Sequence, residues 1–232
     1  MDTADNQAQD HQQPTNNEEV SNQGSDQNEP GDEFSDPFDQ FLKAIREEDF
    51  DTFKSLLDKN DDFATRIEII TRQPPIFTIM GAINEDTCLK MLEYIEKKGA
   101  DLGHRDGLRQ NIIFYAARDG KMKVLDYLVE KGVTINVADS YDQTPLYYSA
   151  RDGHVEMTAK LVDLGLDPNS VDKNHQPCLF YAAKLGHLET CKTLVEKGAK
   201  HDYTDKNKQN ALFWAKKSGN KDLIDYLNQL KQ

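Results

Sequence analysis

The 232-residue sequence lacks several features that mark familiar protein classes. It has three cysteines, Cys88, Cys178 and Cys191, and no CxxC pair, so neither a disulfide framework nor a zinc cluster is predicted. No apolar run approaches the roughly 20 residues that span a bilayer, and no basic start precedes an apolar signal region. We therefore expect an intracellular protein of the cytoplasm, the nucleus or both, without membrane insertion.

Motifs that carry catalysis are also missing. The sequence contains no GxGxxG, GxxxxGK[ST], HExxH or GxSxG pattern. His175 and Cys178 lie three residues apart and could be taken for a fragment of a metal site. We favour a structural interpretation, because both residues occupy positions of the repeat described below. The prediction is a protein that is not an enzyme, with no cofactor, no metal and no small-molecule substrate.

Basic residues are absent from positions 1–36, which hold ten acidic side chains among Gln, Asn, Ser, Thr, Pro and Gly. Such a segment has too little apolar surface to offset the entropy lost on ordering, so residues 1–36 are predicted to be a disordered acidic tail. Subtracting the ten acids from the total of 41 leaves 31, against 28 basic residues, so most of the net charge of -13 belongs to the tail. The acidity argues against direct nucleic-acid binding.

A 33-residue repeat is the strongest pattern in the chain. Three series share this period: Asp106, Asp139, Asp172 and Asp205; Gly120, Gly153, Gly186 and Gly219; and Gly99, Gly132, Gly165 and Gly198. Between these markers similar text recurs, such as TPLYYSARDGHVE from Thr144 and PCLFYAAKLGHLE from Pro177. A period of this length indicates a stacked-repeat architecture.

The residues of one unit predict a helix pair. Asn111, Thr144 and Asn210 are good N-cap residues, and Pro145 suits a first helical turn. The first helix ends at a glycine that allows a tight reversal, and a second helix follows with apolar residues at helical spacing. One such pair cannot cover its own apolar face, so neighbouring pairs must stack into a solenoid.

This pattern resembles the ankyrin repeat, most fully over residues 139–171, where Thr144, Pro145, Leu146, Ala150 and Gly153 match. The resemblance implies an all-α ankyrin-repeat solenoid that binds proteins. The predicted organisation is a tail (1–36), an N-terminal capping helix pair (37–60), a degenerate repeat with an insertion (61–105), three repeats (106–138, 139–171, 172–204) and a C-terminal capping repeat (205–232).

Two departures from the family pattern are expected to have structural effects. Aromatic residues stand where the family usually has a histidine that bridges neighbouring loops: Phe114, Tyr147, Phe180 and Phe213. The usual glycine at the turn tip is replaced by Arg109, Asp142, His175 and Lys208. Arg and Lys enter the left-handed conformation less readily than glycine, so we expect turn tips that are less regular than in a consensus array.

The first units need separate treatment. The stretch from Asn60 to Arg72 matches no repeat position and is predicted to be a longer loop or an extra turn. The interval from Pro75 to Gly99 is four residues longer than that from Pro145 to Gly165, so one or both helices of this unit should be extended. The segment FSDPF, from Phe34, resembles short peptides that bind clathrin-adaptor appendage domains, but we favour Phe38 as the first residue of the capping helix.

In the ankyrin family, partners usually contact the turn tips and the exposed end of the first helix. The corresponding positions here are a glutamine column, a basic stripe and two apolar tip residues: Gln110, Gln143, Gln176 and Gln209; Arg118, Arg151, Lys184 and Lys217; and Leu108 and Tyr141. The stripe should be partly neutralised by Asp119 and Asp152 and bare in the later units. It predicts a partner with an acidic or phosphorylated segment.

Other interpretations remain open at this stage. The cations could be a solvated helix surface with ion pairs inside each repeat, or they could bind the chain's own acidic tail. The predicted role is an adaptor or regulatory subunit, with a structural or auxiliary subunit of a larger assembly or enzyme complex as the alternative.

Overall fold

The structure, a computed structural model, describes residues 36–230, so the predicted disorder of the tail lies outside the described residues except for Asp36. This part contains twelve helices and no strand, which confirms the all-α prediction. The helices are α1 (Pro37–Arg46), α2 (Phe50–Lys59), α3 (Pro75–Met80), α4 (Glu85–Lys97), α5 (Ile112–Asp119), α6 (Met122–Glu130), α7 (Pro145–Arg151), α8 (Val155–Asp163), α9 (Cys178–Leu185), α10 (Leu188–Glu196), α11 (Ala211–Ser218) and α12 (Lys221–Gln229).

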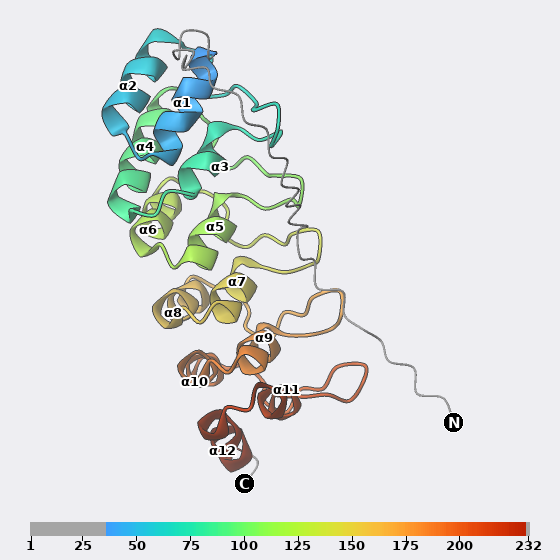
Figure 1. Cartoon of the computed structure of the whole chain (residues 1–232). Coiled ribbons are helices and arrows are strands. Elements are labelled where there is room, and N and C mark those ends of the chain that lie inside the picture. Colours follow the sequence, from blue (N-terminus) through green and yellow to red (C-terminus); the bar gives the residue numbers. More distant parts are fainter. Residues whose placement is uncertain (1–35, 231–232) are drawn as a thin grey trace, which may run out of the picture. The chain divides into compact units, whose positions relative to one another are not determined.

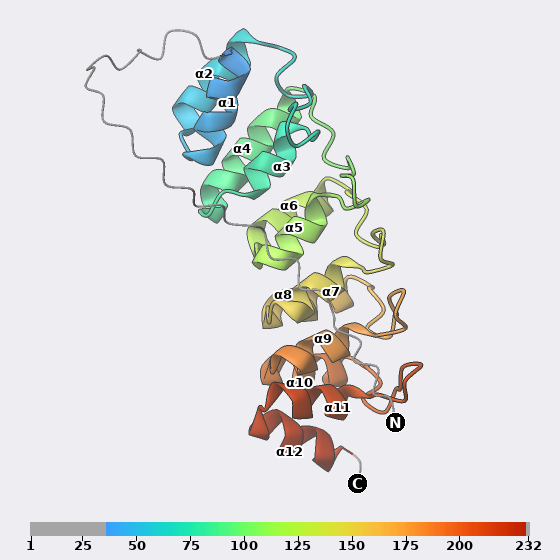
Figure 2. The same ribbon diagram turned by 45° about the vertical axis from the view of Figure 1, so that its right-hand side comes forward.

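The helices stack as six antiparallel pairs, and the loops between successive pairs all project on the same side (Figures 1 and 2). The first helices pack in one row, from α1 against α3 to α9 against α11. Second helices form another row, in which α2 packs against α4 and α10 against α12. None of the helices in residues 36–230 has the length and apolar character needed to cross a bilayer.

Columns of buried side chains join the units into one core. Two of these columns follow the 33-residue period: Ile113, Leu146, Leu179 and Leu212 on the first helices, and Leu128, Leu161, Leu194 and Leu227 on the second. Each of these side chains is at most 7% exposed. Because an apolar residue at each position meets its counterparts in the adjacent units, stacking buries the surface that a single pair would leave in water.

Aromatic packing closes the array at its first helix pair. The rings of Phe38, Phe41, Phe53 and Phe63 lie with centroids 5.1–5.9 Å apart and are all buried. Asp36 begins α1, since its carboxylate accepts a hydrogen bond from the backbone N–H of Phe38. Phe38 therefore lies in the first turn of α1, whose first residue is Pro37 and not Phe38 as expected.

The degenerate unit places its extra length in one helix. The first helix, α3, has only 6 residues, whereas α4 has 13, against 9 in α8. Because α4 and α8 both end two residues before a glycine of the repeat, the extra residues lie at the start of α4. There the Glu85 carboxylate accepts a hydrogen bond from the backbone N–H of Lys123, in α6, at 2.7 Å. At the other end of α4, Tyr94 and the C-cap residue Lys98 contact the carboxylate of Asp58, in α2, at 2.6 and 2.7 Å. The extension therefore joins this unit to the next one, while the end of α4 joins it to α2.

The turn tips are more regular than the sequence predicts. Arg109, Asp142, His175 and Lys208 have φ values of 66°, 61°, 58° and 59°, so all four adopt the left-handed conformation. The expectation of irregular tips was wrong, because the preceding aspartate holds each turn by accepting backbone hydrogen bonds. Those bonds offset the cost of the left-handed residue, about 1–2 kcal/mol.

One predicted helix cap behaves differently from its counterparts. Asn111 and Asn210 cap α5 and α11 by accepting hydrogen bonds from backbone N–H groups. Thr144 stands at the N-cap of α7, but its hydroxyl makes no capping bond and is buried without a hydrogen-bond partner in residues 36–230. Pro145 starts this helix with a fixed φ and no N–H to satisfy, so α7 forms without the threonine cap.

Candidate protein-binding surface

Each regular turn tip is built on one aspartate. In the unit that begins at Asp139, the carboxylate oxygen Oδ1 accepts hydrogen bonds from the backbone N–H groups of Tyr141 and Gln143, at 2.7 and 3.0 Å. Asp106, Asp172 and Asp205 hold their turns in the same way. The aspartate column therefore shapes the tips and is not a set of free carboxylates.

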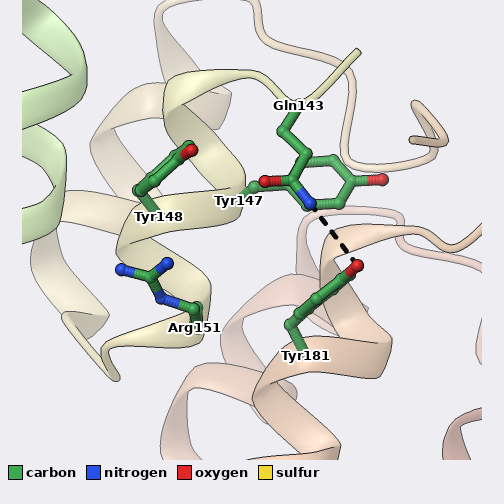
Figure 3. Close-up of a pocket in the computed structure, with 5 residues that line it drawn as sticks. All are labelled: Gln143, Tyr147, Tyr148, Arg151 and Tyr181. Carbon is green, nitrogen blue, oxygen red and sulfur yellow. Dashed lines mark hydrogen bonds between the residues drawn. The ribbon is translucent and has the colours of Figure 1, made fainter. Parts of the chain in front are cut away.

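The second carboxylate oxygen of the three later aspartates links neighbouring units through a glutamine. Gln110 donates to Asp139 Oδ2 at 2.9 Å and to the hydroxyl of Tyr148 at 2.6 Å, and Tyr148 donates to the same oxygen at 2.8 Å. Gln143 repeats the arrangement with Asp172 and Tyr181, and the Gln143–Tyr181 bond is drawn in Figure 3. Gln176 continues it to Asp205. We call this the Gln–Asp–Tyr ladder.

The ladder changes the interpretation of the glutamine column. Gln110 is only 6% exposed, and the side-chain amides of Gln143 and Gln176 donate hydrogen bonds to aspartates of the next unit. Their period reflects contact between units, so we leave these three residues out of the docking surface. Gln209 stands at the same position, and in the described part of the chain no unit follows that could offer it an aspartate.

The ladder also extends into the segment that seemed to match no repeat. Arg72 has a φ of 55°, like the other tip residues, and the following Gln73 hydrogen-bonds Tyr115 as Gln110 bonds Tyr148. Residues 68–73 therefore form a turn tip. Residues 60–72 hold turns and no helix, as expected for a longer loop or an extra turn, but the part from Glu68 does match a repeat position. Sequence comparison missed it because Glu68 replaces the aspartate and the loop is one residue longer.

A second column joins the units at the start of the second helices. His154 Nε2 lies 2.7 Å from the carbonyl oxygen of Arg118, and His187 Nε2 lies 2.9 Å from that of Arg151. At the equivalent positions Lys121 donates to the Met80 carbonyl and Asn220 donates to the Gly186 carbonyl. We call these four side chains the bridging column; each joins its own unit to the preceding one.

The basic stripe divides into two halves. Arg118 forks onto Asp119 at 2.7 and 3.1 Å, and Arg151 forks onto Asp152 at 2.9 Å through both nitrogens. Each guanidinium also lies over a tyrosine ring, 4.8–4.9 Å from its centroid. These contacts raise the pKa of both guanidinium groups above the ordinary value through the bonded aspartates. The charge of this half is largely neutralised in place.

Lys184 and Lys217 form the other half and are exposed. Neither makes an ion pair within residues 36–230, and both ammonium groups lie over the Trp214 ring, at 5.6 and 5.4 Å from its centroid. The neighbour of Lys184 is Leu185, which is 53% exposed, where the earlier units have aspartate. The later half of the stripe thus combines free positive charge with an exposed apolar side chain.

The two predicted tip anchors are accessible. Leu108 is 44% exposed and Tyr141 is 56% exposed, although the backbone of both is fixed by the aspartate turn. Side chains held on a rigid backbone lose little entropy on binding, which favours their use as contacts.

A family model for ankyrin repeats in three copies matches residues 79–172 and 160–231. Together these ranges cover more than half of the chain. The chain belongs to the ankyrin-repeat family. A comparison with curated proteins found no match. Ankyrin repeats are generally protein-interaction modules, and the membership supports that broad function for this array.

The ankyrin array replaces the usual bridging histidine with other chemistry. Tyr147 stands at that position in the unit of residues 139–171, and its hydroxyl donates to the carbonyl oxygens of Ser170 and Gln176. Burial raises the pKa of Tyr147 far above its usual range, so the hydroxyl stays a donor. At this position an aromatic side chain therefore supplies a loop-to-loop hydrogen bond as well as ring packing.

A small pocket opens beside this tyrosine. It has a volume of about 80 Å³ and is lined by Gln143, Tyr147, Tyr148, Arg151 and Tyr181 (Figure 3). Ligand pockets for small molecules are usually about 300–1,000 Å³. Because its polar groups also belong to the ladder and to the Arg151–Asp152 pair, we assign the pocket no chemistry.

In the part of the chain that the structure describes, neither the possible metal ligands nor the three cysteines form a reactive site. No three His, Cys, Asp or Glu side chains converge there to hold a metal ion. Cys178 is buried and its thiol lies 3.5 Å from the Pro168 carbonyl, while His175 is exposed at a turn tip. Burial raises the pKa of Cys88 to about 11 and that of Cys178 and Cys191 to about 12, so these thiols are poor nucleophiles.

Proposed function

We propose that the protein is an adaptor or regulatory subunit whose ankyrin array binds an acidic or phosphorylated segment of a protein partner. The observation that supports this most directly is the later half of the basic stripe. Lys184 and Lys217 present two exposed ammonium groups about one repeat apart, free of ion pairs within residues 36–230, and exposed Leu185 follows Lys184 in the chain. Carboxylates or phosphates of a partner would form charge-assisted hydrogen bonds with these two ammonium groups.

The earlier half of the stripe plays a supporting part in this proposal. Arg118 and Arg151 are bound by aspartates and stacked on tyrosines, so a partner would have to displace those contacts first. We therefore place the main electrostatic contact at units 172–204 and 205–232. Three buried thiols with raised pKa values fit a reducing location, the cytoplasm or the nucleus.

The test is a double charge reversal, Lys184→Glu with Lys217→Glu. Proteins recovered by affinity purification from an extract would be compared by quantitative mass spectrometry between the parent and this variant. We expect recovery of specific partners to fall about tenfold or more, and to weaken in the parent as salt rises, because the attraction is ionic and solvent-exposed.

The control is Lys90→Glu with Lys97→Glu, which makes the same charge change at two exposed side chains of α4, in the second-helix row. This control should keep the partners. Equal recovery with the parent and the Lys184/Lys217 variant at every salt concentration would exclude the stripe as the docking site.

A further inference from the structure

Most of the exposed large apolar side chains of residues 36–230 lie on the first three tips in the row of turn tips. There are seven: Ile67, Ile69, Ile70, Ile83, Leu108, Tyr141 and Leu185. Four of them, Ile69, Ile70, Leu108 and Tyr141, lie on three consecutive tips. Exposed apolar groups that cluster in this way mark interaction surfaces, because burying them against a partner removes apolar area from water.

The first of these tips, residues 68–73, is firmly held at its base. The Glu68 N–H donates to the Gln73 carbonyl at 3.0 Å, and the Arg72 N–H donates to the Glu68 carbonyl at 2.9 Å. Glu68 is 7% exposed, and its carboxylate accepts hydrogen bonds from Arg46 at 2.8 Å and from Thr71 at 2.5 Å. On this fixed base Ile69 and Ile70 are 88% and 90% exposed.

A pocket lies beside the same tip. It has a volume of about 80 Å³, and its walls are mostly apolar, from Ala64, Ile67, Pro74, Ile76 and Ala100. It has room for the end of an aliphatic side chain. The isoleucine pair and this pocket together give the first tip the character of an aliphatic contact site.

The last two tips have the opposite character. At the positions of Leu108 and Tyr141 they carry Asn174 and Asn207, and exposed cations stand beside them: Lys173, Lys206 and Lys208. Lys206 and Lys208 make no ion pair within the described residues. Their positive charge adds to that of Lys184 and Lys217 on the adjoining first helices.

We infer that the turn tips bind an extended protein segment that carries aliphatic side chains at one end and acidic side chains at the other. This inference rests on the proposed function and adds the aliphatic half of the ligand. Four repeat steps separate the tip at 68–73 from the tip at 205–209. At about 10 Å for each stacked helix pair the separation is about 40 Å, which about 12 extended residues would span.

The experiment uses a displayed library of random 20-residue peptides and selects those that bind to the immobilised full chain. We expect enriched peptides to hold two or more aliphatic residues and a separate acidic cluster about 12 residues away. The best peptide would then be labelled with fluorescein, and its affinity measured by fluorescence anisotropy. The double variant Ile69→Ser and Ile70→Ser should weaken it about tenfold or more, since two apolar contacts are lost.

Matched variants separate the two proposals. Ile83→Ser removes an isoleucine that is 94% exposed but lies between α3 and α4, away from the tips, and it should leave the affinity unchanged. Selection of acidic peptides without aliphatic residues, or an unchanged affinity in the Ile69/Ile70 variant, overturns the inference while the proposed function stands. Selection of peptides without acidic residues, insensitive to Lys184→Glu with Lys217→Glu, overturns the proposed function.

Two other occupants of the tip at residues 68–73, a second copy of the chain and a membrane, would be detected by experiments in solution. Concentration-dependent dimers in sedimentation velocity, lost in the Ile69/Ile70 variant, would assign the tip to a second copy of the chain. Cosedimentation with phosphatidylserine vesicles, lost in the same variant, would assign it to a membrane. Either result, obtained without selection of aliphatic-acidic peptides, overturns the inference.

Discussion

Gly153 and Gly186 occupy the same repeat position and differ in what lies beside them. Both have a left-handed backbone, with φ of 79° and 78°. A Cβ added at Gly153 would lie 2.8 Å from Nδ1 of His187, whereas at Gly186 the nearest atom would be 3.4 Å away, on Asn220. The bridging column therefore adds a steric constraint to one glycine and not to the other.

This difference predicts unequal costs for the same substitution. Gly186→Ala should lower the free energy of unfolding by about 1–2 kcal/mol, the cost of a left-handed alanine. Gly153→Ala should cost roughly 1 kcal/mol more, because the His187 ring must move and its bond to the Arg151 carbonyl is weakened. Urea denaturation of both variants measures the difference. Equal midpoints would show that the ring gives way without cost.

Periodicity predicted which residues recur but not which way they face. The 33-residue spacing of His154 and His187 indicated a structural role, and their bonds to neighbouring carbonyls agree with it. The same logic placed Gln110 on a docking surface, because a column of polar residues at turn tips is equally compatible with solvent and with the next unit. Only the position of Tyr148 and Asp139 in the folded array shows that the amide is buried.

At the scale of elements, the junction between the capping pair and the repeats depends on a small ionic cluster. Asp58, on α2, contacts Lys54 at 2.7 Å on its own helix. It also contacts Tyr94 of α4 and Lys98, the residue that follows α4. Hydrogen bonds from Lys54, and then from Lys98 and Tyr94, hold the pKa of the Asp58 carboxyl well below its ordinary value. A lowered folded-state pKa means that this contribution is present above the ordinary carboxyl pKa of 3.8 and is lost as the pH falls below it.

Asp58→Asn should therefore loosen the capping pair without disturbing the later repeats. We expect faster amide hydrogen exchange in α1 and α2 at neutral pH and unchanged exchange in α7 to α10, because each unit contacts only its neighbours. Asp51→Asn, an exposed acid on α2 without an ion pair in the described residues, is the control. Uniform acceleration along the array would contradict the prediction.

The lengths of the elements in this region could be predicted only in part. The four extra residues between Pro75 and Gly99 signalled a longer helix, but not which one. The structure assigns the extra length to the start of α4, where the Glu85 carboxylate accepts hydrogen bonds from the backbone N–H groups of Lys123 and Val124 in α6. The tip at 68–73 was missed because hydrogen bonding preserves its geometry while its length and key residue differ from the repeat.

At the scale of the whole molecule, the Gln–Asp–Tyr ladder gives the array a dependence on alkaline pH. Burial, and then the hydrogen bond to Asp106, raises the pKa of Tyr115 to about 12, and the same two causes raise that of Tyr148 and Tyr181 further. Each neutral hydroxyl donates to an aspartate that shapes a tip. Because the folded-state pKa is raised, the stabilisation is complete below the unfolded pKa of about 10 and is lost as the pH rises beyond it.

Stability should consequently fall between about pH 10 and pH 12. Tyr148→Phe should lower the free energy of unfolding by about 1 kcal/mol at pH 8, because one hydrogen bond is lost. Between pH 10 and pH 12 the free energy of unfolding of this variant should fall less steeply than that of the parent, because one titrating donor is gone. Urea unfolding at several pH values measures the decline, and tyrosinate absorbance measures the titration itself. Tyr141→Phe, an exposed tip residue, should follow the parent. The idea would be falsified if Tyr148→Phe and the parent declined in parallel.

The ladder and the bridging column also allow a whole repeat unit to be inserted without loss of hydrogen bonds between units. A donor in each unit reaches an acceptor at a constant offset, from Gln110 to Asp139 and from Gln143 to Asp172. A tandem duplication of residues 139–171 would supply each inserted donor with its acceptor and leave no new orphan at either seam. A duplicated unit of 33 residues keeps this offset without any rearrangement. The bond from Gln73 to Tyr115 shows that a longer unit can also join the ladder when its extra residues lie in the loop and in the second helix.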